Sequence, residues 1–298
     1  MTVYLPSTPD TCQSDDLSSY NPLKRVPNVR KGETMEKLPI ALVQASILRK
    51  SPEENHRMLV RETTRAGELG ARIAILPELW NVAYLPGTKD APELKEEQAL
   101  EPFREVARRY GMAIVAGSMA VKSKEERVNR CHVVGPGGDL VGAYDKVHPF
   151  RLFDESGSFK AGSTLGLVEL FGWKIGILVC FDIEFPELCR ALAEKGAEAL
   201  LVAGAWPLDH VRIWRTLLVA RAIENQLFTV GANRCDKGPS IRFGGTSLVV
   251  DPYGEIILHL DDLPRTEIAV LLKGKVENAR KTHPVWNSRR EELYKKWK

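Results

Sequence analysis

Short apolar runs alternate with longer amphipathic segments along most of this sequence. The runs fall at 38–44, 73–76, 113–117, 173–179 and 199–203. The segments 51–69, 96–110, 186–195 and 211–225 have the spacing of helices, and a glycine follows each of the first three. Apolar runs of this length favour buried strands, and a glycine directly after an amphipathic segment is typical of a helix end. The pattern therefore predicts strands that alternate with helices.

Hairpin-like strands are expected between and after these units. The runs 129–134 and 140–144 flank a Gly-rich turn, and further strands are predicted at 227–232, 246–250, 255–260 and 267–272. A polar helix or tail follows at 288–298. Strands that are apolar on both faces need cover on both sides. We therefore expect an α/β fold in which two mixed sheets face each other and helices lie outside.

The N-terminal segment differs from the rest. Residues 1–37 are rich in Ser, Thr, Pro and Asp and have no hydrophobic period, which predicts a flexible extension. The compact domain is expected to span 38–298, and Met35 lies just before its first strand. The N-terminus lacks the apolar core of a secretory signal, and no apolar run is long enough to span a membrane.

The composition argues against several classes of function. The net charge is only +3, and no basic stripe with interleaved aromatic residues is present, so nucleic acid is not an expected partner. The five cysteines are an odd number without CxxC spacing, which favours a reducing, cytoplasmic compartment over a disulfide framework. Cysteines and histidines do not cluster at the spacing of metal ligands. We expect neither a metal nor another cofactor.

Three polar residues share one placement, directly after a predicted strand. They are Glu78, Lys146 and Cys180. Strand ends can gather at one edge of an α/β sheet. A thiolate is a competent nucleophile, and a carboxylate can take the thiol proton and return it to a departing amine. Lys146 and the backbone N–H of Phe181 could stabilise the oxyanion of a tetrahedral intermediate.

These residues lie in segments that resemble the three signatures of the nitrilase, or carbon–nitrogen hydrolase, superfamily. The segments are Leu76-Pro77-Glu78, Tyr144-Asp145-Lys146-Val147-His148 and CFDIEFPE at 180–187, and the resemblance covers about residues 38–290. It implies a Glu78, Lys146 and Cys180 triad that cleaves amides through a thioester. It also implies an α-β-β-α four-layer sandwich and a homodimer or higher homo-oligomer.

The same resemblance implies a second glutamate beside the lysine. The segment Phe153-Asp154-Glu155-Ser156 looks like the block that carries it, so Glu155 is the fourth candidate site residue.

The segment Ala205-Trp206-Pro207, together with Trp214 and 220–225, resembles the branch of ω-amidases that act on 2-oxo-dicarboxylate monoamides. Trp206 is therefore a candidate wall of the acyl pocket, although an aromatic residue packed in the core is an equal alternative. Three nearby basic residues could bind a substrate carboxylate: Arg212, Arg215 and Arg234. Carbamoyl-amine hydrolysis and nitrile hydrolysis remain alternatives to amide hydrolysis.

Other classes of function also remain open. A Cys–His pair with His148 or His210, as in papain-like proteases, would use the same nucleophile. A redox-sensing thiol would need a resolving cysteine, for which Cys189 is a poor candidate, and a non-catalytic binding protein would be expected to have lost part of the constellation.

Overall fold

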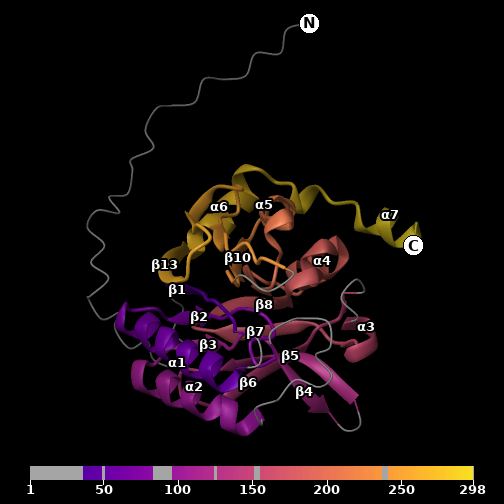
Figure 1. Cartoon of the computed structure of the whole chain (residues 1–298). Coiled ribbons are helices and arrows are strands. Elements are labelled where there is room, and N and C mark those ends of the chain that lie inside the picture. Colours follow the sequence, from indigo (N-terminus) through magenta and orange to yellow (C-terminus); the bar gives the residue numbers. More distant parts are fainter. Residues whose placement is uncertain are drawn as a thin grey trace, which may run out of the picture.

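The computed structural model describes residues 36–48, 51–82, 96–123, 126–150, 155–236 and 241–297, apart from the side chains of Ser123, Glu155 and Ser156. Most of the predicted extension 1–37 lies outside these residues, and the first strand begins at Lys37. Two sheets lie face to face, with helices on the outer side of each (Figure 1). This arrangement confirms the predicted sandwich of two mixed sheets.

The first sheet has seven strands within the described residues. Their order is β13-β1-β2-β3-β5-β4, with β6 also paired to β5. The strands are β1 (Lys37–Gln44), β2 (Ile73–Ile75), β3 (Ala113–Val115), β4 (Met119–Ser123), β5 (Glu126–Val134), β6 (Leu140–Asp145) and β13 (Arg265–Leu272). Pairing is parallel within β1-β2-β3 and antiparallel elsewhere, so the sheet is mixed.

In the part of the chain that the structure describes, the second sheet has six strands in the order β12-β11-β10-β9-β8-β7. They are β7 (Gly166–Leu170), β8 (Trp173–Val179), β9 (Ala199–Gly204), β10 (Phe228–Asn233), β11 (Leu248–Val250) and β12 (Ile256–His259). The three central strands β8, β9 and β10 run parallel, and the outer ones pair antiparallel. This sheet is therefore mixed as well.

The central strands are apolar on both faces because each face packs against a different layer. In β1, Ile40 and Leu42 face the core between the two sheets, while Ala41 and Val43 face the core beneath the helices. Successive side chains of a strand point to opposite faces, so a continuous apolar run fills two cores at once. This explains why the buried runs of the sequence lack an alternating pattern.

Helices α1 (Pro52–Glu68) and α2 (Glu96–Tyr110) cover the first sheet, and α4 (Pro186–Glu194) and α5 (Val211–Asn225) cover the second (Figure 1). The buried side of α2 consists of residues spaced three and four apart: Ala99, Leu100, Phe103, Val106 and Ala107. This is the spacing of one helix face. Gly70 follows α1 with a φ of 89°, as expected for a glycine just beyond a helix end.

Several elements were not predicted. Strands β4 and β7 were missed, and so were α6 (Lys273–Thr282) and α3 (Glu155–Ser158). The structure also has the 3₁₀ turns η4 (Cys180–Glu184), η5 (Leu208–His210) and η6 (Trp286–Ser288). These elements are short or polar, so their periodicity is weak. The predicted C-terminal tail is α7 (Glu291–Lys296), which lies away from the two sheets (Figure 1).

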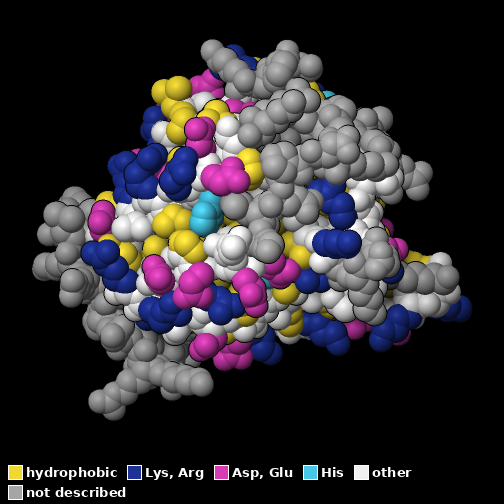
Figure 2. Space-filling model, turned by 60° about the horizontal axis from the view of Figure 1, so that its bottom comes forward, with side chains coloured by type: hydrophobic (Ala, Val, Ile, Leu, Met, Phe, Trp, Pro, Cys, Tyr) yellow, Lys and Arg dark blue, Asp and Glu magenta, His cyan; other side chains and the backbone are white. Residues whose placement is uncertain are grey.

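The surface carries both signs of charge. On the side that Figure 2 brings forward, Lys and Arg side chains lie interspersed with Asp and Glu side chains among the residues shown in colour. Such mixing is typical of a solvated surface without a strong field of one sign. Within the described parts of the chain, no helix is both long and apolar enough to cross a membrane.

Candidate active site

The candidate triad lies at one edge of the sandwich. Glu78 follows β2, Lys146 follows β6 and Cys180 follows β8. Strand β6 runs in the same direction as β2, because β2 is parallel to β3 and two antiparallel pairings separate β3 from β6. The N–H of Glu78 donates to Gly204 O at the end of β9 over 3.3 Å, which joins the same edge of both sheets. The structure therefore brings the three residues together.

The backbone around Glu78 is held in an unusual shape. Leu79 has a φ of 45°, in the left-handed region that a leucine rarely adopts. Its N–H donates to Ser118 Oγ over 3.0 Å, and the indole N–H of Trp80 donates to Ala116 O over 2.9 Å. Gly117 allows this close approach, because a Cβ there would lie 2.1 Å from Pro77 O. These contacts fix the direction in which Glu78 leaves the backbone.

Glu78 and Lys146 form a buried ion pair. Lys146 Nζ donates to Glu78 Oε1 over 2.8 Å, and the two side chains are 1% and 0% exposed. Asn129 Nδ2 donates to the same carboxylate oxygen over 3.0 Å. A buried ion pair costs desolvation energy that close geometry and further hydrogen bonds must offset. The Glu78 carboxylate has both the close contact with Lys146 and the further hydrogen bond from Asn129.

Cys180 stands at a sharp strand-to-helix turn. Its φ is 48°, and η4 begins at the same residue. A left-handed conformation at a residue other than glycine costs about 1–3 kcal/mol and persists only when the surroundings enforce it. Asp182 helps to hold this conformation, because its Oδ2 accepts the N–H of Val179 over 3.1 Å.

Asp182 also connects this turn to the segment that carries Lys146. Its Oδ2 accepts the hydroxyl of Tyr144 over 2.7 Å, and its Oδ1 accepts the N–H of His148 over 3.0 Å. The His148 ring contacts the same Oδ1 through Nδ1 over 2.9 Å. Asp182 is fully buried. One carboxylate two residues after the thiol therefore fixes the residues on either side of the lysine.

The surroundings of the Cys180 thiol disfavour its thiolate form. The residue as a whole is partly exposed, but protein surrounds its thiol. Burial raises the pKa of the thiol well above its usual value, and the Glu78 carboxylate raises the pKa further through its charge and a hydrogen bond. Lys146 and a backbone hydrogen bond from Ala205 act in the opposite direction. A base would be needed for this thiol to act as a nucleophile, and Glu78 lies within reach.

The remaining site candidates lie in different surroundings. Phe181 is the second residue of η4, and its ring contacts Phe150 and Phe185. Glu155 begins α3, and its side chain lies outside the described part of the structure. Trp206 is 5% exposed and packs in the same apolar cluster as Trp214, with a ring distance of 5.6 Å; Cys180 also borders this cluster.

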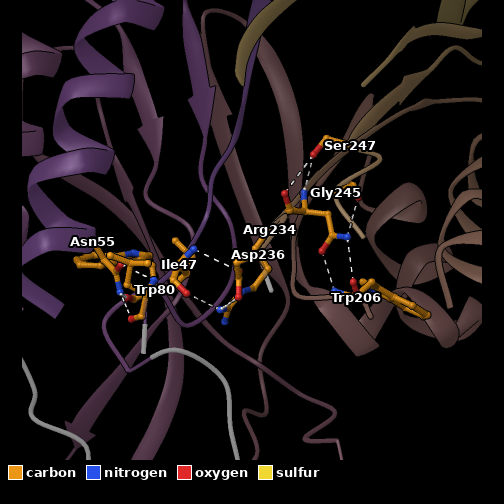
Figure 3. A network of polar contacts seen from close by, with 10 residues as sticks. Ile47, Asn55, Trp80, Trp206, Arg234, Asp236, Gly245 and Ser247 are labelled. Carbon is orange, nitrogen blue, oxygen red and sulfur yellow. Dashed lines mark hydrogen bonds and ion pairs between the residues drawn. The ribbon is translucent and has the colours of Figure 1, made fainter. Parts of the chain in front are cut away.

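A polar network holds the Trp206 loop at the site edge (Figure 3). Trp206 N donates to Asn233 Oδ1 over 2.7 Å, and Asn233 Nδ2 donates back to Trp206 O and to Gly245 O. Ser247 Oγ accepts the N–H of Asn233 over 2.9 Å. The backbone next to Ala205, which contacts the thiol, is therefore fixed from β10 and β11.

The three candidate carboxylate-binding arginines are not grouped at the thiol. Arg234 forms a buried bidentate ion pair with Asp236 at 2.5 and 2.7 Å and donates to Ile47 O over 2.8 Å (Figure 3). Arg212 and Arg215 are exposed on α5. Arg234 is thus part of a structural ion pair.

The papain-like alternative does not fit this site. The ring of His148 is held by Asp182 and stacks on Phe185 with a centroid distance of 3.6 Å, and His210 is exposed in η5. The charged groups that act on the thiol are Glu78 and Lys146 instead.

Cys189 is a poor partner for redox chemistry. It is fully buried, and burial raises its pKa to about 12, so it forms little thiolate. Among the described residues, no cluster of three His, Cys, Asp or Glu side chains could hold a metal ion.

A thiol at a strained strand end, beside a buried carboxylate and ammonium, defines the class of the cysteine hydrolases that act on carbon–nitrogen bonds. Residues 39–281 match the model of the carbon-nitrogen hydrolase family, and the chain belongs to that family. It is an amidase-type hydrolase of the nitrilase superfamily, as the sequence signatures predicted. The non-catalytic binding protein is therefore not favoured.

Named relatives include 2-oxoglutaramate amidase of Bacillus subtilis, which is 36% identical over 75% of this chain and 87% of its own length. The omega-amidase YafV of Escherichia coli K12 is 35% identical over 85% of this chain and 96% of its own length.

Solved structures agree with this assignment. An amidase from Nesterenkonia sp. has a TM-score of 0.75 and 29% identity, covering 88% of this chain and 96% of that chain. In another structure of that enzyme, the acetamide moiety of fluoroacetamide is covalently added to the active-site cysteine.

Two residues of the site escaped sequence reasoning. Asp182 stands inside the quoted CFDIEFPE segment, so its place beside the nucleophile was a signal that could have been used. Asn129 lies within a strand and carries no comparable signal, because its partner Glu78 is 51 residues away.

Proposed function

We propose that this protein hydrolyses a small aliphatic amide through a cysteine thioester, with Cys180 as nucleophile, Glu78 as general base and Lys146 as oxyanion donor. The observation that carries the proposal is the buried Glu78–Lys146 pair within reach of a thiol whose pKa burial and Glu78 raise. A neutral thiol beside a carboxylate needs only a local proton transfer to become a nucleophile.

The reaction can be written with every proton accounted for. Glu78 takes the thiol proton as Sγ of Cys180 attacks the amide carbon, and Lys146 and the N–H of Phe181 donate to the oxyanion. The C–N bond then breaks, and Glu78 returns the proton to the leaving nitrogen, which departs as ammonia. Water attacks the thioester while Glu78 accepts its proton. The C–S bond then breaks, Glu78 gives that proton to Sγ of Cys180, and the carboxylic acid product leaves.

Glu155 is proposed as the residue that positions Lys146 and the substrate. The resemblance of the 153–156 segment to the family block supports this role. Trp206 is proposed as a wall of the acyl pocket, because it follows Ala205, whose backbone contacts the thiol, and borders the same apolar cluster as Cys180.

The proposed substrate is the ω-amide of a 2-oxo-dicarboxylate. Relatives named 2-oxoglutaramate amidase and omega-amidase support this class over N-carbamoyl amines and nitriles. The carboxylate preference rests on these relatives and not on Arg234, which already binds Asp236.

The test compares kcat/KM for a dicarboxylate monoamide and for an uncharged amide of the same length. A desolvated contact to the distal carboxylate is worth about a hundredfold preference for the charged substrate. Equal use of the neutral amide, or exclusive use of a nitrile or an N-carbamoyl amine, would remove the substrate assignment and leave the catalytic residues in place.

We further propose a cytoplasmic homo-oligomer, most simply a dimer. Exposed Ile213 and Ile223 on α5 offer apolar surface on the outer layer of the second sheet. Light scattering of the wild type and of Ile223→Lys tests this: a dimer that the substitution dissociates supports the proposal, and a monomeric wild type refutes it.

A further inference from the structure

Asn129 contacts both charged members of the proposed triad. It lies within β5, is 1% exposed, and donates through Nδ2 to Glu78 Oε1 over 3.0 Å. Its backbone carbonyl accepts the N–H of Lys146 over 2.9 Å. One residue of the first sheet thereby fixes the side chain of the base and the backbone of the oxyanion donor.

The two donors on Oε1 differ in kind. Lys146 brings a positive charge, whereas the amide of Asn129 brings a hydrogen bond without a charge. A hydrogen bond to the charged form of a carboxyl group favours that form. A buried carboxylate that must stay ionised beside a thiol therefore gains from a neutral donor, which stabilises the charge without adding a second cation.

We propose that Asn129 is a positioning residue for the base: it holds Glu78 ionised and oriented toward Cys180. This inference rests on the proposed function, because it assigns a role in the same proton transfer. It predicts that loss of the amide changes the pH at which the enzyme becomes active, and not only its stability.

The charged groups around this contact define what the pH dependence reports. Within the described residues, Glu78 faces Lys146 and the Cys180 thiol. On the strand of Asn129 itself, the neighbouring Arg130 is paired with Asp145 at 2.6 Å. His132 of the same strand contacts Glu96. Arg130 and His132 are thus each already paired with an acid. A shift of the pH profile that appears only when Asn129 is substituted therefore reports on Glu78.

The experiment uses the full-length chain with Asn129→Ala, Asn129→Asp and, as a matched control, Asn225→Ala. Asn225 is also a buried asparagine, but its Nδ2 donates to Arg221 O at the end of α5. Two quantities are measured against pH: kcat/KM for amide hydrolysis, and the rate of Cys180 alkylation by iodoacetamide. Thermal unfolding reports on stability separately.

Asn129→Ala is expected to raise the pKa of Glu78, because its carboxylate form loses a donor. The acid limb of the kcat/KM profile should therefore move to higher pH by about one unit. Asn129→Asp keeps the shape of the side chain but places a second carboxylate beside Glu78, so the limb should move further. In Asn129→Asp the alkylation curve should move to higher pH, because the added negative charge disfavours the thiolate. In Asn129→Ala it should move less in the same direction, because the Glu78 carboxylate loses a neutral donor that offsets part of its charge. Asn225→Ala should lower the melting temperature without moving either curve.

The isosteric Asn129→Asp keeps the test available if Asn129→Ala fails to fold. The inference is overturned if the Asn129 variants, like Asn225→Ala, lose stability or kcat with both pH profiles unchanged. A wild type that hydrolyses no amide would refute the proposed function, and the alkylation curves would then decide the role of Asn129 by themselves.

Discussion

Two buried ion pairs lie at the same edge of the sandwich, and they differ in what surrounds them. Arg234 and Asp236 are two residues apart, and the arginine also donates to Ile47 O and stacks on Phe243 at 4.1 Å. Glu78 and Lys146 are 68 residues apart and lie beside a thiol. Burial of an ion pair is therefore not by itself a sign of chemistry, since both pairs meet that criterion. The two pairs differ in that a thiol lies beside Glu78 and Lys146.

The comparison also shows how each pair is built. The Arg234–Asp236 pair forms within one short segment after β10, and both of its side chains contact the backbone of Ile47 after β1. The Glu78–Lys146 pair joins the ends of β2 and β6, and the thiol comes from the other sheet. Both arrangements therefore link the two sheets, but only the second needs three strand ends to meet.

The largest expected effect on turnover comes from removing the Cys180 thiol. Cys180→Ala should reduce turnover by about 10⁴-fold or more, because the covalent path is lost, while the circular dichroism spectrum stays that of the wild type. Iodoacetamide should inactivate the wild type in step with labelling of Cys180, which peptide mapping distinguishes from any label at Cys12 of the predicted extension. The control is Cys189→Ala, which should keep the turnover of the wild type because that thiol is buried and its pKa is raised to about 12. Substantial turnover by Cys180→Ala would contradict the mechanism.

Lys146→Ala should reduce turnover by about 10²–10³-fold, the cost of one lost oxyanion donor. Because Lys146 lowers the thiol pKa, its removal should also raise that pKa and move Cys180 alkylation to higher pH. The variant leaves Glu78 buried without its cation, so unfolding must be measured beside activity. Unchanged turnover together with an unchanged alkylation curve would show that Lys146 has no part in the chemistry.

Glu78→Gln should separate thiolate formation from catalysis. Glu78 raises the thiol pKa by its charge and its hydrogen bond, so the neutral amide should lower that pKa and move alkylation to lower pH. Turnover should nevertheless fall by about 10²–10⁴-fold, because the proton acceptor and donor is gone. Turnover equal to that of the wild type would rule out Glu78 as the base.

Substitutions in the Arg234–Asp236 pair should change stability and leave the Cys180 thiol unaffected. Arg234→Met should destabilise the fold by about 3–5 kcal/mol, because it leaves Asp236 buried without a cation. The double variant Arg234→Met, Asp236→Leu should recover much of that loss, since it removes both charges. At a temperature where the variants are folded, the pH dependence of Cys180 alkylation should match the wild type. A shifted alkylation curve would place this pair within the electrostatics of the site.

The sequence predicted the layers and the triad for a physical reason. Long apolar runs such as 173–179 have to be buried on both faces, and a polar residue directly after such a run, like Cys180, lies at a sheet edge. Strands such as β4 and β7 were missed because a charged residue interrupts each apolar run, at Lys122 and Glu169. Asn129 was missed because its role depends on a contact between distant strands. The ion pair of Arg234 likewise depends on its side-chain conformation, which periodicity does not encode.

The smallest expected effect concerns the N-terminal segment. A shortened chain that begins at Met35 should fold and turn over like the full-length protein, because the composition of residues 1–34 offers little apolar surface to offset the entropy of ordering. This chain keeps Glu36, whose carbonyl accepts the N–H of Lys273 over 2.9 Å, and Leu38, which is fully buried.

The matched control begins at Ile40 and loses the pairing of Lys37, Leu38 and Pro39 with β13. It should be destabilised by about 2–4 kcal/mol, because a buried leucine and three positions of strand pairing are removed. Both chains are compared with the full-length protein by thermal unfolding and by kcat/KM for an amide. If the chain from Met35 is destabilised as much as the chain from Ile40, residues 1–34 contribute to the domain, and the boundary at 37/38 between extension and catalytic domain is wrong.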